Sequence, residues 1–269
     1  MKHQKIFSSL TRKITCNSVV YKIYEKILWT QIREGEKPEH IGVILDGNRR
    51  WAFKHSIPFW TGHRYGADKV EDLLKWCIDL DIKTITLYIF STENFNRISQ
   101  EIQEIMKILD EKLKIIFSNE RIHRDKVKVR VIGRINLLPE STQKLIRLVE
   151  ESTKEYDQHY LNLAIAYGGR AEIVDAAKKI AEEVKVGKMN VIDINEGTIE
   201  EHLYTAHLIK SEPDIIIRTS GEERLSGFLL WQGAYSELCF IDVFWPDFRR
   251  IDLWRAIRTY QQRERRYGS

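Results

Sequence analysis

Two patterns of apolar residues alternate along this chain. Short runs of consecutive apolar residues are typical of buried strands, and longer stretches with apolar positions three and four residues apart are typical of amphipathic helices. The runs predict strands near residues 41–45, 84–90, 127–132, 161–166, 214–217 and 238–242. The stretches between them predict helices near residues 65–79, 100–117, 140–156, 171–184, 198–204 and 251–265. Since this alternation implies right-handed crossovers, we expect an α/β fold, with a mostly parallel central sheet flanked by helices.

The first 39 residues do not follow this alternation. Residues 1–18 are polar, with several Ser and Thr and scattered Lys, so we expect a poorly ordered tail. In residues 20–32 the apolar positions share one helical face, which predicts an amphipathic helix. That helix either packs on its own domain or, as a basic interfacial helix, lies against a membrane or guides a lipid product. The predicted organisation is therefore an N-terminal tail and amphipathic helix, 1–39, followed by one domain, 40–269.

Composition narrows the class of protein. Apolar residues make up 43% of the 269 residues and charged residues 30%, which is ordinary for a soluble globular protein. No apolar stretch approaches the roughly 18 to 20 residues that span a bilayer, and the polar start lacks the apolar core of a secretory signal. The three cysteines, Cys16, Cys77 and Cys239, lack metal-ligand spacing. These features predict a cytoplasmic protein in a reducing compartment.

The net charge of +4 is small and unevenly placed. Residues 1–39 hold eight Lys or Arg against four Glu, a difference that accounts for the entire excess. A dedicated nucleic-acid binder normally has a strongly basic face and a higher isoelectric point. The charge therefore argues against nucleic acid as a partner.

The apolar run at residues 41–45 ends abruptly in Asp46-Gly47-Asn48-Arg49-Arg50-Trp51. Ligands of open α/β sheets bind at the carboxyl ends of the strands. An acid, an amide and two guanidinium groups at that edge are what holding a polyanion with a divalent metal ion requires. An ordinary charged turn is the alternative, although such a turn has no need of two adjacent arginines.

A second short run, at residues 214–217, opens into a segment with similar chemistry. Residues 218–227 contain two arginines, hydroxyl groups and glycines. Glycines let backbone amides approach an anion, and arginine offers a planar fork of donors to diphosphate oxygens. Two such clusters at strand ends indicate a diphosphate-binding site.

Five segments, in order and at plausible spacing, resemble the signature segments of cis-prenyltransferases of the undecaprenyl diphosphate synthase type. They lie at residues 46–51, 90–97, 167–170, 218–226 and 231–247. The resemblance implies a single α/β domain of non-Rossmann topology, with residues 40–269 as the catalytic domain of a homodimer. The implied reaction is a condensation of an allylic diphosphate primer with successive isopentenyl diphosphates, dependent on Mg²⁺. Its product would be a long-chain polyprenyl diphosphate.

The resemblance also assigns roles to residues. It makes Asp46 the central catalytic acid and a Mg²⁺ ligand, and it places Glu237 as a second metal ligand. For the allylic diphosphate it implies Gly47, Asn48, Arg49, Arg50, Trp51 and His63. For isopentenyl diphosphate it implies Arg218, Arg224, Leu225 and Ser226.

The segment at residues 90–97 follows another predicted strand. The resemblance assigns it to substrate positioning and to the proton-transfer step, through Ser91, Thr92, Glu93, Asn94, Phe95 and Arg97. An amide is a poor base, so we interpret Asn94 as a group that orients substrate or water. A cap before the following helix is the structural alternative. In the family, helices that follow the first two strands line a tunnel for the growing chain, whereas core packing is the default for residues 100–117.

Two positions depart from the family pattern. The family usually has an arginine where this chain has Phe59, so the allylic pocket either lacks one cation or takes it from another residue such as Arg64. We therefore expect primer affinity to depend more heavily on Arg50. Many bacterial members have a histidine where this chain has Glu223, which puts a metal role for that position in doubt.

Two other functions fit the sequence less well than the enzyme does. A non-catalytic regulatory subunit of the same fold typically loses the acidic and arginine motifs, which this chain retains. A phosphate- or nucleic-acid-binding protein is disfavoured by the balanced charge. Residues 21–35 resemble archaeal family members. This resemblance implies geranylgeranyl diphosphate as primer and a glycan carrier lipid as product. Peripheral contact with a membrane is the alternative interpretation of the helix at residues 20–32.

Overall fold

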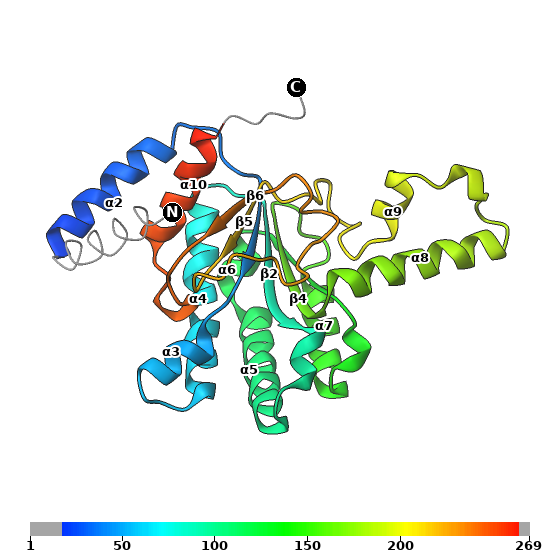
Figure 1. Ribbon diagram of the computed structural model, residues 1–269, viewed down its shortest axis with the longest axis horizontal. Helices are drawn as coiled ribbons and strands as arrows, with labels where there is room; N and C mark the ends of the chain where they lie inside the picture. The colour runs from blue at the N-terminus through cyan, green and yellow to red at the C-terminus, as the bar shows by residue number, and fades with distance from the viewer. Residues whose placement is uncertain (1–17, 264–269) are drawn as a thin grey trace. The chain divides into compact units, whose positions relative to one another are not determined.

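The computed structural model describes residues 18–263 (Figure 1). All but the last residue of the predicted tail, together with Cys16, therefore lies outside the described residues. The described residues form two compact units, Pro38–Phe248 and residues 18–37 with 249–263. The C-terminal helix thus groups with the N-terminal helix, and the predicted division into 1–39 and 40–269 stays a prediction.

A parallel sheet forms the centre of the larger unit. Its strands are β1 (His40–Ile44), β2 (Thr84–Ser91), β3 (Val127–Ile132), β4 (His159–Tyr167), β5 (Ile215–Arg218) and β6 (Glu237–Phe240). They lie in the order β3-β4-β2-β1-β5-β6, and every pairing is parallel. The predicted α/β fold with a mostly parallel sheet is confirmed, and each predicted strand is present.

Strand β1 occupies the middle of the sheet, which explains its uninterrupted apolar run. All of its residues are buried, and Ile41 pairs with Ile85 of β2 and Ile215 of β5. Because the strands run parallel in this register, the segments after β1, β2 and β5 emerge at the same edge. We call this edge the carboxyl edge, and Figure 1 shows the chain passing there from β1 into α3.

Helices connect the strands of the larger unit. They are α3 (Asn48–Lys54), α4 (Phe59–Asp79), α5 (Ser99–Ser118), α6 (Glu120–Arg124), α7 (Glu140–Ser152), α8 (Gly169–Lys185) and α9 (Glu196–His202). Short 3₁₀ turns occur at η1 (Thr92–Asn96), η2 (Ile135–Leu137), η3 (Val191–Asp193) and η4 (Trp245–Asp247). Helix α4 packs against α3 and α5, and α5 packs against α7. The sequence did not predict α3 and α6, because seven and five residues are too few to display a helical period.

The smaller unit pairs α2 (Ser18–Ile32) with α10 (Arg250–Gln262). The rings of Trp29 and Trp254 lie 5.6 Å apart, and Gln261 Nε2 donates to the Ile32 carbonyl at 3.0 Å. A helix is therefore present where the sequence predicted one, and it packs on α10. Leu28 and Ile32 of its apolar positions are buried, whereas Val20, Ile23 and Ile27 are exposed. Membrane contact by α2 stays a prediction. Within residues 18–263, no helix is both long enough and apolar enough to cross a membrane.

A line of hydrogen-bonded polar side chains crosses the buried sheet at residues near the amino ends of its strands. His40 Nε2 lies 2.8 Å from Thr86 Oγ1, and Asn162 Nδ2 donates to the same oxygen at 3.1 Å. His207 Nε2 lies 2.8 Å from Asn162 Oδ1. Burial lowers the pKa of both His40 and His207 to about 4. Both histidines are therefore neutral at pH 7.

We predict that acid destabilises the protein through His40. An unfolded histidine titrates near 6.5, whereas the pKa of buried His40 is about 4, so between these values the unfolded chain binds more protons. The free energy of unfolding should therefore fall as the pH drops through this window, by roughly 1.4 kcal/mol for each pH unit. Urea unfolding at several pH values measures the slope. His40→Gln should reduce it, and the exposed-site variant His55→Gln should not. Equal slopes in the parent and both variants would contradict the prediction.

Candidate functional site

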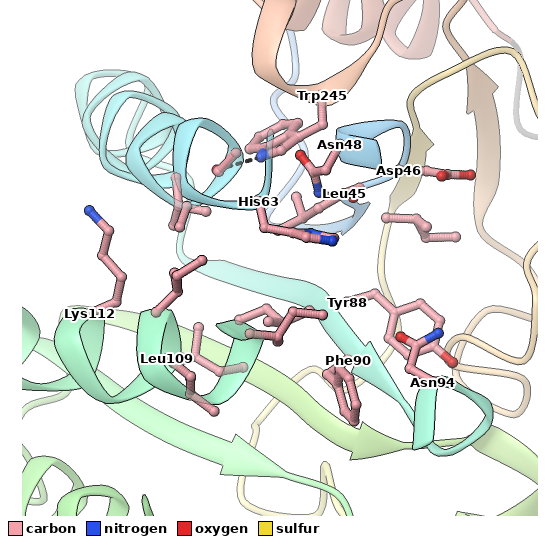
Figure 2. A pocket seen from close by; sticks show the side chains of 18 of the residues that line it. Leu45, Asp46, Asn48, His63, Tyr88, Phe90, Asn94, Leu109, Lys112 and Trp245 are labelled. Carbon is pink, nitrogen blue, oxygen red and sulfur yellow. Dashed lines mark hydrogen bonds between the residues drawn. The ribbon is translucent and has the colours of Figure 1, made fainter. Parts of the chain in front are cut away.

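A cavity of about 490 Å³ opens at the carboxyl edge of the sheet. One end of it, which we call the charged end, is lined by Asp46, Arg49, Arg50, Arg97 and Arg218. Beyond the charged end, the walls are mostly apolar side chains of β2, α4 and α5. Figure 2 shows Asp46 and Asn94 on one side of the cavity, Lys112 on the opposite side, and Leu109 between them. The cavity therefore combines an anion-binding end with an apolar corridor.

Asp46 and Arg218 form the centre of the charged end. Arg218 Nη2 donates to Asp46 Oδ2 at 2.8 Å, and Arg218 Nη1 donates to Ser226 Oγ at 2.7 Å and to the Arg224 carbonyl. The Arg218 side chain is only 6% exposed, which makes it a fixed cation. Burial alone would raise the pKa of Asp46, but the hydrogen bond and charge of Arg218 and the charge of Arg50 lower it below its usual value. Asp46 is therefore ionised at neutral pH.

Gly47 turns the chain from β1 into α3. Its φ of +104° lies in the left-handed region, and a Cβ there would stand 2.7 Å from Phe244 Cδ1. Helix α3 then begins at Asn48, which places two arginines on its first turn. Arg50 Nη1 donates to Glu222 Oε1 at 2.8 Å, and its Nη2 lies 3.3 Å from Asp46 Oδ1. The turn thus brings Arg50 beside Asp46 at the cavity.

Glu101 joins three of the predicted substrate-binding residues, and the sequence analysis did not identify it. This carboxylate at the start of α5 is fully buried. Its Oε1 accepts from Arg97 Nη1 at 2.9 Å and lies 3.1 Å from His63 Nε2, while its Oε2 lies 3.4 Å from Arg49 Nη1. The spacing of Glu101 is the signal that could have identified it. Glu101 precedes Ile105 by four residues and Leu109 by eight, so it lies on the apolar face of the same helix. An acid in that register is a candidate buried partner of cations.

His63 lies on α4 where that helix crosses α3. The close approach depends on Gly66, because a Cβ there would stand 2.1 Å from Asn48 Oδ1. Burial lowers the pKa of His63, and the Glu101 carboxylate opposes this shift. His63 is therefore neutral at pH 7 and held in place by Glu101.

Most predicted site residues meet at the cavity. Its walls include Asp46, Gly47, Asn48, Arg49, Arg50, His63, Ser91, Asn94, Arg97, Arg218 and Ser226. Asn94 Oδ1 accepts from the Ser91 backbone N–H at 3.0 Å and so caps the 3₁₀ turn η1. Helix α5 begins after Ile98 without a side-chain cap, so the cap predicted before that helix is not present. A cap and a place in the cavity wall are compatible for this residue.

Other predicted residues do not line the cavity. These are Trp51, Thr92, Glu93, Phe95, Arg224, Leu225 and Glu237. Trp51 is nearly buried and donates through Nε1 to Asp247 Oδ1 at 2.9 Å. The Phe95 ring packs on Phe90, with centroids 4.9 Å apart. The Arg224 side chain is 64% exposed, and its guanidinium pairs with Glu222. Their predicted roles in substrate binding stay predictions.

Glu237 lies far from Asp46 within the chain. It is the first residue of β6 and pairs with Ile215 at the start of β5. The Asp46 backbone N–H instead donates at 3.0 Å to Thr219 Oγ1, which lies just beyond the other end of β5. Four residues of strand separate Ile215 from Thr219, about 13 Å at roughly 3.3 Å each. The two carboxylates of one chain therefore cannot share one metal ion. Within residues 18–263, no cluster of three or more His, Cys, Asp or Glu side chains could hold a metal.

Arg64 does not replace the arginine that the family usually has at the position of Phe59. Its guanidinium pairs with Glu111 Oε2 at 2.7 Å, and Arg64 is absent from the cavity walls described here. Arg49 instead lies over the Phe59 ring, with its Cζ 5.9 Å from the ring centroid, and it does line the cavity. The suggestion of Arg64 is therefore wrong, because its side chain extends toward α5 on the protein surface.

Comparisons with known proteins agree with this geometry. The family model of undecaprenyl diphosphate synthases matches residues 44–268. A relative from Methanopyrus kandleri is 53% identical over 249 residues, which cover 93% of this chain and 91% of the relative. One from Methanocaldococcus jannaschii is 53% identical over 252 residues, which cover 94% and 90%. Both are named tritrans,polycis-undecaprenyl-diphosphate synthase (geranylgeranyl-diphosphate specific).

Two solved structures are also similar. Lavandulyl diphosphate synthase from Lavandula x intermedia, in complex with dimethylallyl diphosphate, has a TM-score of 0.82 and 34% identity, covering 87% of this chain and 99% of that one. A probable undecaprenyl diphosphate synthase from Campylobacter jejuni has a TM-score of 0.71 and 32% identity, covering 87% and 100%. These names are those of synthases, and they give no support to the regulatory-subunit alternative.

We predict that Glu101→Gln lowers the pKa of His63 further. Burial already lowers this pKa, and the hydrogen bond and charge of Glu101 are what oppose the shift. The histidine C2 proton resonances measured as a function of pH by NMR report the change. Glu111→Gln is the matched control, because Glu111 also lies on α5 and pairs with an α4 residue, but at the exposed surface. An unshifted His63 titration in Glu101→Gln would refute this role of Glu101.

Proposed function

Since the chain belongs to the undecaprenyl diphosphate synthase family of cis-prenyltransferases, we propose that it extends geranylgeranyl diphosphate with successive isopentenyl diphosphates. The proposed product is a long-chain polyprenyl diphosphate that serves as a glycosyl carrier lipid. One observation carries this proposal: a single cavity has arginines around an ionised Asp46 at one end and apolar walls beyond. That combination suits a substrate with a diphosphate head and an isoprenoid tail.

The primer is proposed from the relatives. Those from Methanopyrus kandleri and Methanocaldococcus jannaschii are named as geranylgeranyl-diphosphate specific, and each shares 53% of its aligned residues with this chain. The apolar corridor beside the charged end gives such a primer a place for its tail. Shorter allylic diphosphates are the alternatives that an assay separates.

The residues at the charged end bind and stabilise the diphosphates. When the allylic carbon–oxygen bond breaks, its electron pair stays with the departing diphosphate, and arginine guanidinium groups stabilise that charge. The double bond of isopentenyl diphosphate then forms the new carbon–carbon bond, and loss of a proton sets the cis double bond. Asn94 orients substrate or water during that loss. Side chains such as Phe90, Ile105 and Leu109 exclude water, which would otherwise capture the cation.

We propose Asp46 as the protein ligand of Mg²⁺. Mg²⁺ usually binds one or two carboxylates together with water and substrate phosphates, so a second protein carboxylate is not required. The lowered pKa of Asp46 keeps its carboxylate ionised, which fits that role. Bound Mg²⁺ would supply positive charge to the diphosphate, while the arginines hold the diphosphate in position.

Two further properties are proposed. A homodimer is proposed from the family resemblance. Peripheral membrane contact is supported by exposed Val20, Ile23 and Ile27 of α2, with Lys22 and Lys26 exposed on the same helix. Apolar residues beside basic ones are typical of helices that lie in a membrane interface.

We predict that the protein incorporates labelled isopentenyl diphosphate into butanol-extractable product. The reaction is run with Mg²⁺ and separately with dimethylallyl, farnesyl and geranylgeranyl diphosphate. Product should require Mg²⁺, form best with geranylgeranyl diphosphate and vanish in Asp46→Ala, because the ionised acid organises the charged end. Asp72→Ala, at an exposed α4 position, is the control. Absence of product with every primer would overturn the proposed function.

We also predict that Arg50→Ala raises the KM for the allylic primer. Hydrogen bonds to charged groups contribute about 1.5–3 kcal/mol, so the increase should be roughly tenfold or more. Steady-state kinetics with varied primer measure it. Lys54→Ala is the matched control, because Lys54 lies on the same helix and outside the cavity walls described here. An unchanged primer KM in Arg50→Ala would refute the dependence on Arg50.

A further inference from the structure

Away from the charged end, the cavity wall contains exposed residues between helices α4 and α5. Glu71 of α4 and Ile115 of α5 line it, yet both are exposed, Ile115 to 45%. Lys112, one turn before Ile115 on α5, also lines it. Exposed side chains among the lining residues show that the cavity wall lies at the protein surface here. We call the place framed by Glu71, Lys112 and Ile115 the second opening.

The second opening is well separated from the charged end along α5. Glu101 contacts Arg49 and Arg97 of the charged end. Ile115 follows Glu101 by fourteen residues of the same helix, about 21 Å at about 1.5 Å per residue. Between them, Ile105, Leu109 and Leu113 line the corridor with buried apolar side chains. Figure 2 shows the same separation, with Lys112 on the side away from Asp46 and Asn94.

The corridor has another end, and that one is closed. Leu74 and Ile122 line both the main cavity and a small adjoining cavity of about 10 Å³. A space of that size is at the limit for one water molecule, so it cannot admit a hydrocarbon chain. Leu74 and Ile122 therefore form a floor. A tail that reaches this floor can extend further by turning toward the second opening.

A single weak ion pair bridges α4 and α5 at the second opening. Lys112 Nζ pairs with Asp68 Oδ1 at 2.5 Å, which ties α5 to α4. The Asp68 side chain is 61% exposed, and ion pairs at such sites contribute little to stability. Lysine can keep its aliphatic stem against apolar surface while its ammonium stays in water. The contact can therefore open without loss of the surrounding packing.

We propose that the second opening is an exit through which the apolar tail of the growing chain leaves the cavity. This inference rests on the proposed function. Each condensation inserts new carbons at the diphosphate, so a chain held by its head at the charged end advances its tail along the corridor. The exit lets elongation continue after the tail has reached the floor. Exposed Ile115 offers the emerging hydrocarbon an apolar contact.

Blocking the exit tests the proposal. Ile115→Trp adds bulk at the second opening, and Lys114→Trp adds the same bulk at the neighbouring exposed position, which is outside the cavity walls described here. Product lengths are separated by chromatography after labelling with isopentenyl diphosphate. In Ile115→Trp the ratio of long to short products should fall about tenfold, which corresponds to about 1.4 kcal/mol on the partition between elongation and release. Lys114→Trp should match the parent.

A second pair of variants distinguishes the exit from the floor. Lys112→Met removes the ammonium but keeps an apolar stem, so products should become longer. Leu74→Ala opens the floor instead. Unchanged product lengths in both Ile115→Trp and Lys112→Met would overturn the exit, as would longer products in Leu74→Ala alone. Failure of the proposed function would be distinct, because the parent protein would then incorporate no label at all.

Discussion

The ion pair between Asp46 and Arg218 joins the carboxyl ends of two neighbouring parallel strands, β1 and β5, and the charged end of the cavity is built around it. Parallel pairing brings these residues to 2.8 Å although 172 positions separate them in the chain. The guanidinium is nearly buried, so loss of the carboxylate would leave a buried charge without a partner, which is costly. In return, Arg218 keeps Asp46 ionised despite its burial. One contact thus sets both the charge of the acid and the position of the arginine.

The other arginines at the charged end are also paired with carboxylates before any substrate arrives. Glu101 holds Arg49 and Arg97, and Arg50 lies between Asp46 and Glu222. These pairs offset repulsion among neighbouring guanidinium groups and limit their conformational freedom. The Arg49 side chain is 62% exposed, so it can turn toward a ligand, whereas Arg218 cannot. A diphosphate offers more charge and more acceptor atoms than a carboxylate, which gives it an advantage in competing for the exposed arginines.

Helix α5 connects the two halves of the cavity. Its fourth-residue spacing places Glu101, Ile105 and Leu109 on one face, so a single helix contributes a carboxylate at the charged end and apolar side chains along the corridor. Helix α4 does the same from the other side, with His63 near the charged end and Val70 and Leu74 beyond it. An anionic head and an apolar tail are therefore recognised by the same pair of helices. This is the physical basis for assigning a polyprenyl diphosphate to the cavity.

The sequence by itself determined the strand and helix pattern, the parallel sheet and the residues that gather after β1, β2 and β5. Buried strands and amphipathic helices carry their periods in the order of the residues, and parallel strands bring their carboxyl ends to one edge. The sequence missed α3, whose seven residues show no period, and it missed Glu101. The spacing of Glu101 places it on an apolar helix face, but only the tertiary structure brings its partners Arg49 and His63 to it. Only the tertiary structure shows that Glu237 lies away from Asp46 and that Arg49 lies over the Phe59 ring. It also shows that Arg64 pairs with Glu111 at the surface. The reason is that side-chain direction and strand order depend on packing between distant segments, which the local pattern of residues does not encode.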